Sequence, residues 1–242
     1  YRELLDFHAG DADRTAFLAA DLDRILWAAG VAVDSGDSTV TDRQVDALEA
    51  FITTAGDHEI AAQASHVLAG IAREHGDLVE ARALADAAAR RHPRSVGGRL
   101  CRNLITEIES RDLAVDTERT WAAPWPALEV TYRNLARLHL RLAKADWRTR
   151  LVAGKPHAAW LDDEDRGAIL RLPAVKTATV DLPATTDFRE RRHDVPATVF
   201  EPDSLEPGAY WVIASGDPGF GDKDNVVQAT LVWITRLAVV AD

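Results

Sequence analysis

The spacing of apolar residues along this chain changes once, near Asp112. Before that point apolar residues recur every three or four positions. After it they alternate with polar ones, as in Ala-Arg-Leu-His-Leu-Arg-Leu over residues 136–142. The first spacing lines one side of a helix, and the second lines one face of a strand. The sequence therefore predicts an α-helical domain over residues 1–110, followed by a β domain over residues 111–242.

Composition narrows the class of protein. With 242 residues, 47% of them hydrophobic and 28% charged, the chain can form two globular domains of ordinary size. The net charge of −11 argues against nucleic acid, whose phosphates need a basic face, and against anionic membrane surfaces. No stretch of 18 apolar residues is present, so no membrane span is predicted.

The beginning of the chain and its sulfur content bear on its context. Tyr1 starts what reads as the middle or end of a helix, and the chain contains no methionine. Both features suggest an excerpt of a longer polypeptide, with targeting signals upstream. Cys101 is the one cysteine, so no internal disulfide can form. This fits a cytosolic protein, and equally an envelope protein stabilised by large cores.

Polar caps and apolar stripes predict the first two helices. Asp11 or Asp13 can cap the first, and Gly30 with the stretch 34–37 ends it. Thr41 begins a capping box for the second. The apolar residues on one side of these helices are Phe17, Leu18, Leu22, Ile25 and Leu26, then Val45, Leu48 and Ile52.

Two further helices follow before Pro93. Gly56 closes the second helix and Asp57 can open the third, while Asp77, with Glu80 three residues later, marks the start of the fourth. Their apolar residues are Ile60, Val67, Leu68 and Ile71, then Leu78, Ala81, Leu84, Ala85 and Ala88.

Residues 62–95 resemble a tetratricopeptide repeat. The matching positions are Leu68 and Ala69 (large, then small), Ala81 and Ala88 (small), and the closing Pro93. Small residues let two antiparallel helices approach closely. Because repeats need neighbours, we expect residues 12–56 on one side. On the other we expect a capping helix that starts at Ser95 and carries Val96, Leu100, Cys101, Leu104 and Ile108. Such a unit either binds a peptide or partner in its groove or serves as a spacer, and the fold alone does not decide between them.

The β half shows clear alternation. A first strand carries Leu113 and Val115, residues 124–126 mark a turn or strand edge, and Leu128, Val130 and Tyr132 alternate with polar residues. This pattern indicates one face on a core and one in water. Further strands are predicted at residues 137–144, 175–182, 195–200, 208–215 and 226–235, with a short acidic-started helix at 161–170 and the start of another strand at 237–240. About seven short strands separated by turns predict an antiparallel immunoglobulin-like sandwich.

Several segments resemble the N-terminal part of bacterial alpha-2-macroglobulin-like proteins. They are residues 93–104, which lead into Ile108 and Leu113; 128–135, followed by 138–144; 195–210, which hold a Leu-Glu-Pro-Gly turn before Tyr210; and the exit at 235–238. The resemblance covers about residues 93–242 and, more loosely, the helices before them.

The resemblance implies a large periplasmic or extracellular protein, often a lipoprotein, that traps attacking proteases. Such proteins stack macroglobulin sandwiches, present a cleavable bait, and in many members carry a reactive thioester with the signature Cys-x-Glu-Gln. Cys101 lies in Cys-Arg-Asn-Leu and does not match that signature. No functional residue of the family therefore transfers to this chain, and Cys101 reads as a small core residue.

No catalytic, cofactor-binding or metal-binding residue is predicted. The eight histidines form no zinc-binding pair, and we expect His139 to point to solvent. Ser215 lies outside any Gly-x-Ser-x-Gly turn, and no phosphate-binding loop or dinucleotide fingerprint is present. Asp217, Asp222, Asp224 and Asn225 cluster in one loop, but their spacing does not match the twelve-residue calcium loop, and a solvated turn explains them.

Seven tryptophans are many for this length. They could form a sugar-binding platform, for which Trp125 and Trp211 are the candidates, or they could pack in cores and between domains. We expect Tyr210 and Trp233 to point into the sandwich and Trp211 to point away from it.

The sequence thus predicts a non-enzymatic segment without cofactors: a helical repeat domain, then a macroglobulin-like sandwich. By the resemblance, this segment belongs to a protease-trapping endopeptidase inhibitor of the cell envelope. Its expected partners are further domains of the same longer chain and, through the full-length protein, host or competitor proteases. Two alternatives stay open. One is a helical-repeat adaptor that binds a partner peptide, and the other is a carbohydrate-binding β module.

Overall fold

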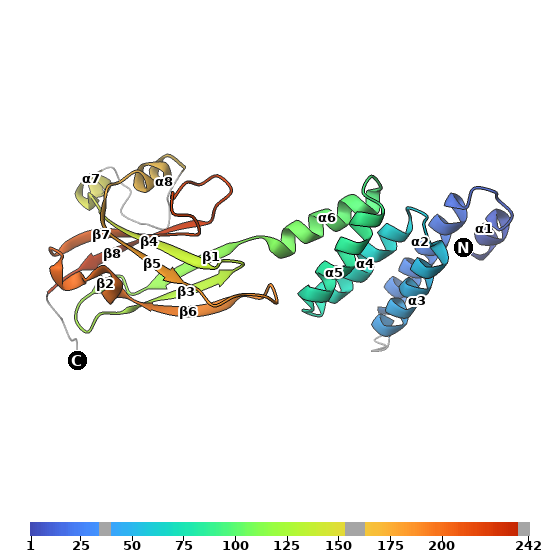
Figure 1. Cartoon of the computed structure of the whole chain (residues 1–242), viewed down its shortest axis with the longest axis horizontal. Helices are drawn as coiled ribbons and strands as arrows, with labels where there is room; N and C mark the ends of the chain where they lie inside the picture. The colour runs from blue at the N-terminus through green and yellow to red at the C-terminus, as the bar shows by residue number, and fades with distance from the viewer. Residues whose placement is uncertain (34–39, 153–162, 237–242) are drawn as a thin grey trace. The chain divides into compact units, whose positions relative to one another are not determined.

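The computed structural model describes residues 1–33, 40–152 and 163–236. The chain divides into two compact units, Tyr1–Glu109 and Ser110–Asp242. The first is helical, and the second holds antiparallel and mixed sheets with two short helices (Figure 1). The predicted helix end at 34–37, the residues 161 and 162 of the predicted acidic helix, and the predicted strand at 237–240 lie outside the described residues.

The described part of the first unit contains six helices. They are α1 (Arg2–His8), α2 (Thr15–Val33), α3 (Val40–Ala55), α4 (Ala61–Glu74), α5 (Leu78–Arg91) and α6 (Val96–Glu109). The stripes predicted from sequence meet in one core between α2, α3 and α4. Its buried members include Leu18, Leu22, Ile25, Leu48, Phe51 and Leu68.

Some of the predicted helix ends are confirmed. The Asp77 side chain accepts a hydrogen bond from the Glu80 amide at 3.0 Å, so it caps α5. Asp13, rather than Asp11, accepts from the Thr15 amide at 2.9 Å at the start of α2. Gly56 follows α3 with φ +57°, a left-handed conformation that glycine adopts readily after a helix.

Other predicted helix ends were wrong. Gly30 lies inside α2, which runs on to Val33, and α3 already includes Val40, one residue before Thr41. Asp57 does not open α4, whose N-cap is Ile60; its carboxylate instead accepts hydrogen bonds from the Arg91 guanidinium at the end of α5.

Helix α6 packs against α4 and the end of α5 through glycines. A Cβ atom at Gly97 would collide with the backbone of Ala62 and Gln63, and one at Gly98 would collide with the His92 carbonyl oxygen. The Ser95 hydroxyl accepts from the Gly98 amide at 2.9 Å and so caps the helix. On α6, Cys101, Leu104 and Ile108 are buried as expected. Val96 and Leu100 are exposed, because they lie on the side of α6 that the described helices leave uncovered.

The second unit contains two sheets. Its strands are β1 (Asp112–Thr117), β2 (Thr120–Trp121), β3 (Ala127–Arg133), β4 (Arg137–Lys144), β5 (Ala174–Asp181), β6 (Arg191–Pro196), β7 (Gly208–Ser215) and β8 (Val227–Ile234). One sheet has the order β1-β3-β6 and the other β2-β8-β7-β4-β5. All neighbours are antiparallel except β2 and β8, which are parallel.

The two sheets share one hydrophobic core, and the predicted alternation is confirmed. Leu128, Val130 and Tyr132 of β3 and Leu138, Leu140 and Leu142 of β4 are all buried within it. Tyr210 points into the same core, and its hydroxyl donates to the Glu206 carbonyl oxygen at 2.8 Å. These inward side chains from both sheets hold the layers together.

The five-stranded sheet has a second core on its opposite face, under α8 (Asp163–Leu170) (Figure 1). Trp211 points to this face, as predicted, and is only 1% exposed. The Arg166 guanidinium of α8 donates to the Val227 carbonyl at 2.7 Å and to the Asp222 carboxylate at 2.9 Å. Arg141 donates to the Leu170 carbonyl at 3.1 Å and lies over the Phe220 ring. Both faces of this sheet are therefore covered, not one.

Two further predictions in the β unit were wrong, and one short helix was missed. Trp233 does not point inward: its side chain is 36% exposed and lies edge-on to Trp147, with ring centroids 5.0 Å apart. The strand predicted at 195–200 ends at Pro196, and a 3-10 helix, η1 (Ala197–Phe200), follows. The short helix α7 (Trp147–Val152) was not predicted.

None of the helices in the described ranges is both long and apolar enough to cross a bilayer.

Candidate functional site

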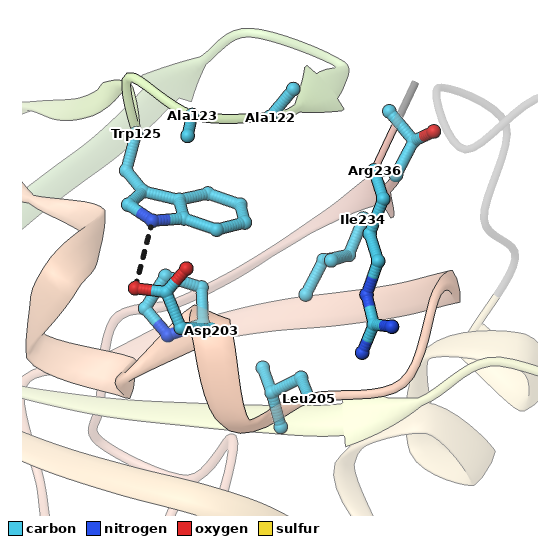
Figure 2. Close-up of a pocket in the computed structure, with 9 residues that line it drawn as sticks. Ala122, Ala123, Trp125, Asp203, Leu205, Ile234 and Arg236 are labelled. Carbon is cyan, nitrogen blue, oxygen red and sulfur yellow. Dashed lines mark hydrogen bonds between the residues drawn. The ribbon is translucent and has the colours of Figure 1, made fainter. Parts of the chain in front are cut away.

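A pocket of about 260 Å³ opens at one end of the sandwich, where three segments far apart in sequence meet. Figure 2 shows the Trp125 indole on one side, Asp203 beside it, and the Arg236 side chain across the pocket. Leu205 and Ile234 line it between them. Its volume lies just below the roughly 300–1,000 Å³ of clefts that hold drug-sized ligands, so it suits a ligand of amino-acid or monosaccharide size.

Main-chain hydrogen bonds position each of these segments. Trp125 lies in the turn between β2 and β3, where the Pro126 carbonyl accepts from the Ala197 amide at 2.9 Å. Asp203 lies in the 3-10 helix η2 (Pro202–Ser204), which follows η1 directly. Arg236 follows β8, and the Thr235 amide next to it donates to the Trp121 carbonyl at 2.9 Å. Although Trp125, Asp203 and Arg236 lie outside the strands, main-chain hydrogen bonds to neighbouring segments fix the position of the pocket walls.

The pocket presents two opposite charges beside an aromatic ring. The Trp125 indole N–H donates to the Asp203 carboxylate over 3.4 Å, a long and weak bond. Arg236 makes no ion pair with Asp203 and no hydrogen bond to any other residue of the described ranges. Pro202, Leu205 and Ile234 are buried, so the pocket floor is apolar. Both charged groups are exposed at its mouth and open to a ligand.

A second cavity, of about 440 Å³, lies between α3, α4 and α5. Ile52, Leu68 and Leu84 give it an apolar base, while Glu49 and Arg91 supply polar groups at its sides. Arg91 is engaged with Asp57, and this hydrogen bond holds the pKa of the Asp57 carboxyl below its usual value. A side chain of another molecule could insert into this groove.

Apart from Trp125, the residues considered from the sequence lie outside the pocket of the β unit. Cys101 is fully buried in the helical unit, near the Ala62 carbonyl, and burial raises the pKa of its thiol to about 11. A thiol that stays protonated is a poor nucleophile. His139 is half-buried rather than solvated, with Nδ1 3.4 Å from the Thr179 hydroxyl.

Hydrogen bonds within the loop and from α8 hold three of the four side chains that cluster in the acidic loop after β7. Asp217 accepts from the Gly219 amide at 2.8 Å, and Asp222 is bound by Arg166. The Asn225 amide donates to the Ser215 hydroxyl and the Gly221 carbonyl. Within residues 1–33, 40–152 and 163–236, no three His, Cys, Asp or Glu side chains are grouped to hold a metal ion.

A side-chain network in the helical unit was missed by the sequence reasoning. The Thr15 hydroxyl donates to Asp13 at 2.6 Å and lies 3.1 Å from His58 Nε2, while the Ile60 amide donates to His58 Nδ1. The Thr15 hydroxyl and amide bonds lower the pKa of the Asp13 carboxyl. The network ties the start of α2 to the turn before α4. Thr15 and His58 are 43 positions apart, so the sequence gave no local signal for this network.

Of the two tryptophans considered for sugar binding, the structure leaves one accessible. Trp211 is covered by α8, whereas Trp125 lines the pocket at the end of the sandwich. No protein-family model, curated protein or solved structure matches the chain.

Proposed function

We propose that this chain is a non-catalytic framework segment of a bacterial alpha-2-macroglobulin-like protein, a protease-trapping endopeptidase inhibitor of the cell envelope. In this proposal a tetratricopeptide-like helical unit precedes a macroglobulin-type, immunoglobulin-like sandwich, and the two supply structure and contacts to further domains. The full-length protein would be periplasmic or extracellular, with a lipid anchor as one form of attachment.

The observation that carries the proposal is the hydrogen bond from Tyr210 to the Glu206 carbonyl. A tyrosine near the start of the penultimate strand, bonded to the main chain a few residues upstream, is the tyrosine corner of immunoglobulin-like sandwiches. Here it occurs within the segment Leu-Glu-Pro-Gly-Ala-Tyr at 205–210, one of those that resemble the macroglobulin family. This hydrogen bond therefore supports an immunoglobulin-like sandwich, and it lies in one of the segments on which the sequence resemblance rests.

The strand order gives further support. In the first sheet β3 lies between β1 and β6, and in the second β4 lies between β5 and β7. Such pairing of strands that are not consecutive is typical of Greek-key sandwiches. In the helical unit the alanines at the repeat's small positions, Ala69, Ala81 and Ala88, are buried, as close helix packing requires.

The test uses the full-length natural protein that contains this segment. It is incubated with a protease, and hydrolysis of a large protein substrate is compared with that of a small chromogenic peptide. A trap blocks the large substrate and leaves the small one largely unaffected, because enclosure restricts access without blocking the catalytic site of the protease. The proposal would be overturned if the full-length protein left the rate of hydrolysis of the large substrate as unchanged as that of the small one.

The groove between α3, α4 and α5 favours a second candidate, an adaptor that binds a partner peptide. Ala87 lines this groove and is exposed, so Ala87→Trp would fill it. Ala83 is also exposed on α5 but does not line the groove, so Ala83→Trp is the matched control. Peptides selected from a display library on the whole chain should lose binding with the first variant only. Equal binding by both variants would exclude the groove.

A further inference from the structure

The pocket between Trp125, Asp203 and Arg236 has a charge pattern that the framework role does not use. Its two charged side chains are opposite in sign, do not pair with each other, and lie on different sides of an apolar floor (Figure 2). A purely structural contact would not require either charged group to remain unpaired and accessible. We propose that this pocket binds a small zwitterion, an α-amino acid with an aliphatic side chain.

Each part of the pocket matches one part of such a ligand. The Arg236 guanidinium has no hydrogen-bond or ion-pair partner among residues 1–33, 40–152 and 163–236. It can therefore bind a carboxylate, for which its planar set of donors is well suited. Asp203, whose carboxylate accepts from the Trp125 indole N–H, would bind an ammonium group by charge. The buried floor of Pro202, Leu205 and Ile234 would take an aliphatic side chain.

The same pattern disfavours simpler ligands. A simple cation would be attracted by Asp203 and repelled by Arg236, and a simple anion would meet the reverse. A neutral monosaccharide, which Trp125 alone could stack against, gains nothing from a carboxylate and a guanidinium beyond ordinary hydrogen bonds. A zwitterion is a small ligand for which both charges are favourable.

Because Asp203 and Arg236 are exposed, their attraction for a ligand is screened, and the binding expected is weak and salt-dependent. Loss of one charge-assisted contact should therefore weaken binding by about five- to tenfold rather than abolish it. The site is independent of the protease-trapping proposal, because it concerns the β unit alone.

The experiment follows the indole N–H resonance of Trp125 in the whole chain by NMR, assigned through Trp125→Phe. L-Leucine is compared with 4-methylpentanoate, which lacks the ammonium, with isopentylamine, which lacks the carboxylate, and with methyl glucoside. L-Leucine should shift the resonance at concentrations at least five times lower than either analogue. Arg236→Gln and Asp203→Asn should each weaken L-leucine binding about five- to tenfold. Lys223→Gln, which removes one exposed positive charge in the loop after β7, should not.

Three results would overturn the proposal. One is no shift with L-leucine at about 10 mM, where even weak specific sites are occupied. Another is equal binding of L-leucine and its two singly charged analogues. The third is a shift with methyl glucoside that neither charge variant weakens, which would make the pocket a sugar site.

Discussion

The last three helices of the first unit and the sheets of the second pack in opposite ways. Between α4, α5 and α6 the helices come close because the residues between them are small, among them Ala62, Ala69, Ala81, Gly97 and Gly98. The β unit instead fills its layers with large side chains, including Trp121, Tyr132, Phe200 and Trp211. The difference shows where each unit is vulnerable. We expect added volume to damage the helical unit and removed volume to damage the β unit.

The largest effect is expected from truncation of a buried ring in the β unit. Trp211→Ala should lower the free energy of unfolding of that unit by about 3–5 kcal/mol, because it leaves a cavity under α8. Six of the seven tryptophans lie in this unit, so fluorescence during denaturant unfolding reports on it. Trp233→Ala is the matched control on the same face, and because its ring is partly exposed it should cost about 1 kcal/mol. Equal losses for the two would mean that α8 does not seal Trp211.

The converse test adds one methyl group to the helical unit. Gly97→Ala should destabilise that unit by about 1–3 kcal/mol or more, because the new Cβ meets the Ala62 and Gln63 backbone rather than a movable side chain. Far-UV circular dichroism during unfolding reports on the helices. Gly70→Ala lies inside α4 with open space around its Cβ, so it should stabilise by about 0.5–1 kcal/mol. If the two changes had the same sign, the close approach of α6 to α4 would be wrong.

The same contrast explains which parts of the fold could be predicted from sequence. Alternation predicted the faces of β3 and β4, because inward and outward positions differ in polarity there. The faces of Tyr210 and Trp211 were also predicted correctly, although β7 is buried on both sides and shows no such alternation. The prediction failed at Trp233 because β8 carries apolar residues on both faces, Leu231 beside Val232 and Trp233 beside Ile234. Both faces are apolar because the outer one packs against α8 and, at Trp233, against Trp147 of α7. No pattern within β8 reveals those helices.

Local and distant partners show a similar limit. The cap at Asp77 was predictable because its donor, the Glu80 amide, lies three residues away. Asp57 was misassigned because its partner Arg91 lies 34 residues away and competes for the same carboxylate. In the pocket, the prolines beside Trp125 predicted the turn that holds it. Trp125 and Asp203 are 78 positions apart, so nothing in the sequence indicated that their side chains meet.

A smaller effect is expected at the corner of the sandwich. Tyr210→Phe keeps the ring in the core and removes only the hydroxyl that donates to Glu206, so it should cost about 1 kcal/mol. Fluorescence-monitored unfolding measures this. Tyr1→Phe removes a hydroxyl from an exposed ring and should change stability by less than about 0.5 kcal/mol. A cost for Tyr210→Phe no larger than that of the control would remove the main support for an immunoglobulin-like corner.

The smallest expected effect is a pH-dependent loss of stability in the helical unit alone. His66 lies half-buried on α4, and burial, with the nearby charge of Arg73, lowers its pKa below the ordinary value of 6.5. Because the unfolded chain binds this proton more readily, protonation favours unfolding. The helical unit therefore keeps its full stability above pH 6.5 and loses some of it as the pH falls from 6.5 to the folded-state pKa of His66. Solvent screening at a half-buried ring keeps the loss below about 1 kcal/mol. His66→Gln should flatten this part of the pH profile of far-UV-monitored unfolding and leave the fluorescence transition unchanged. A slope that persists in His66→Gln would assign the pH dependence to other groups.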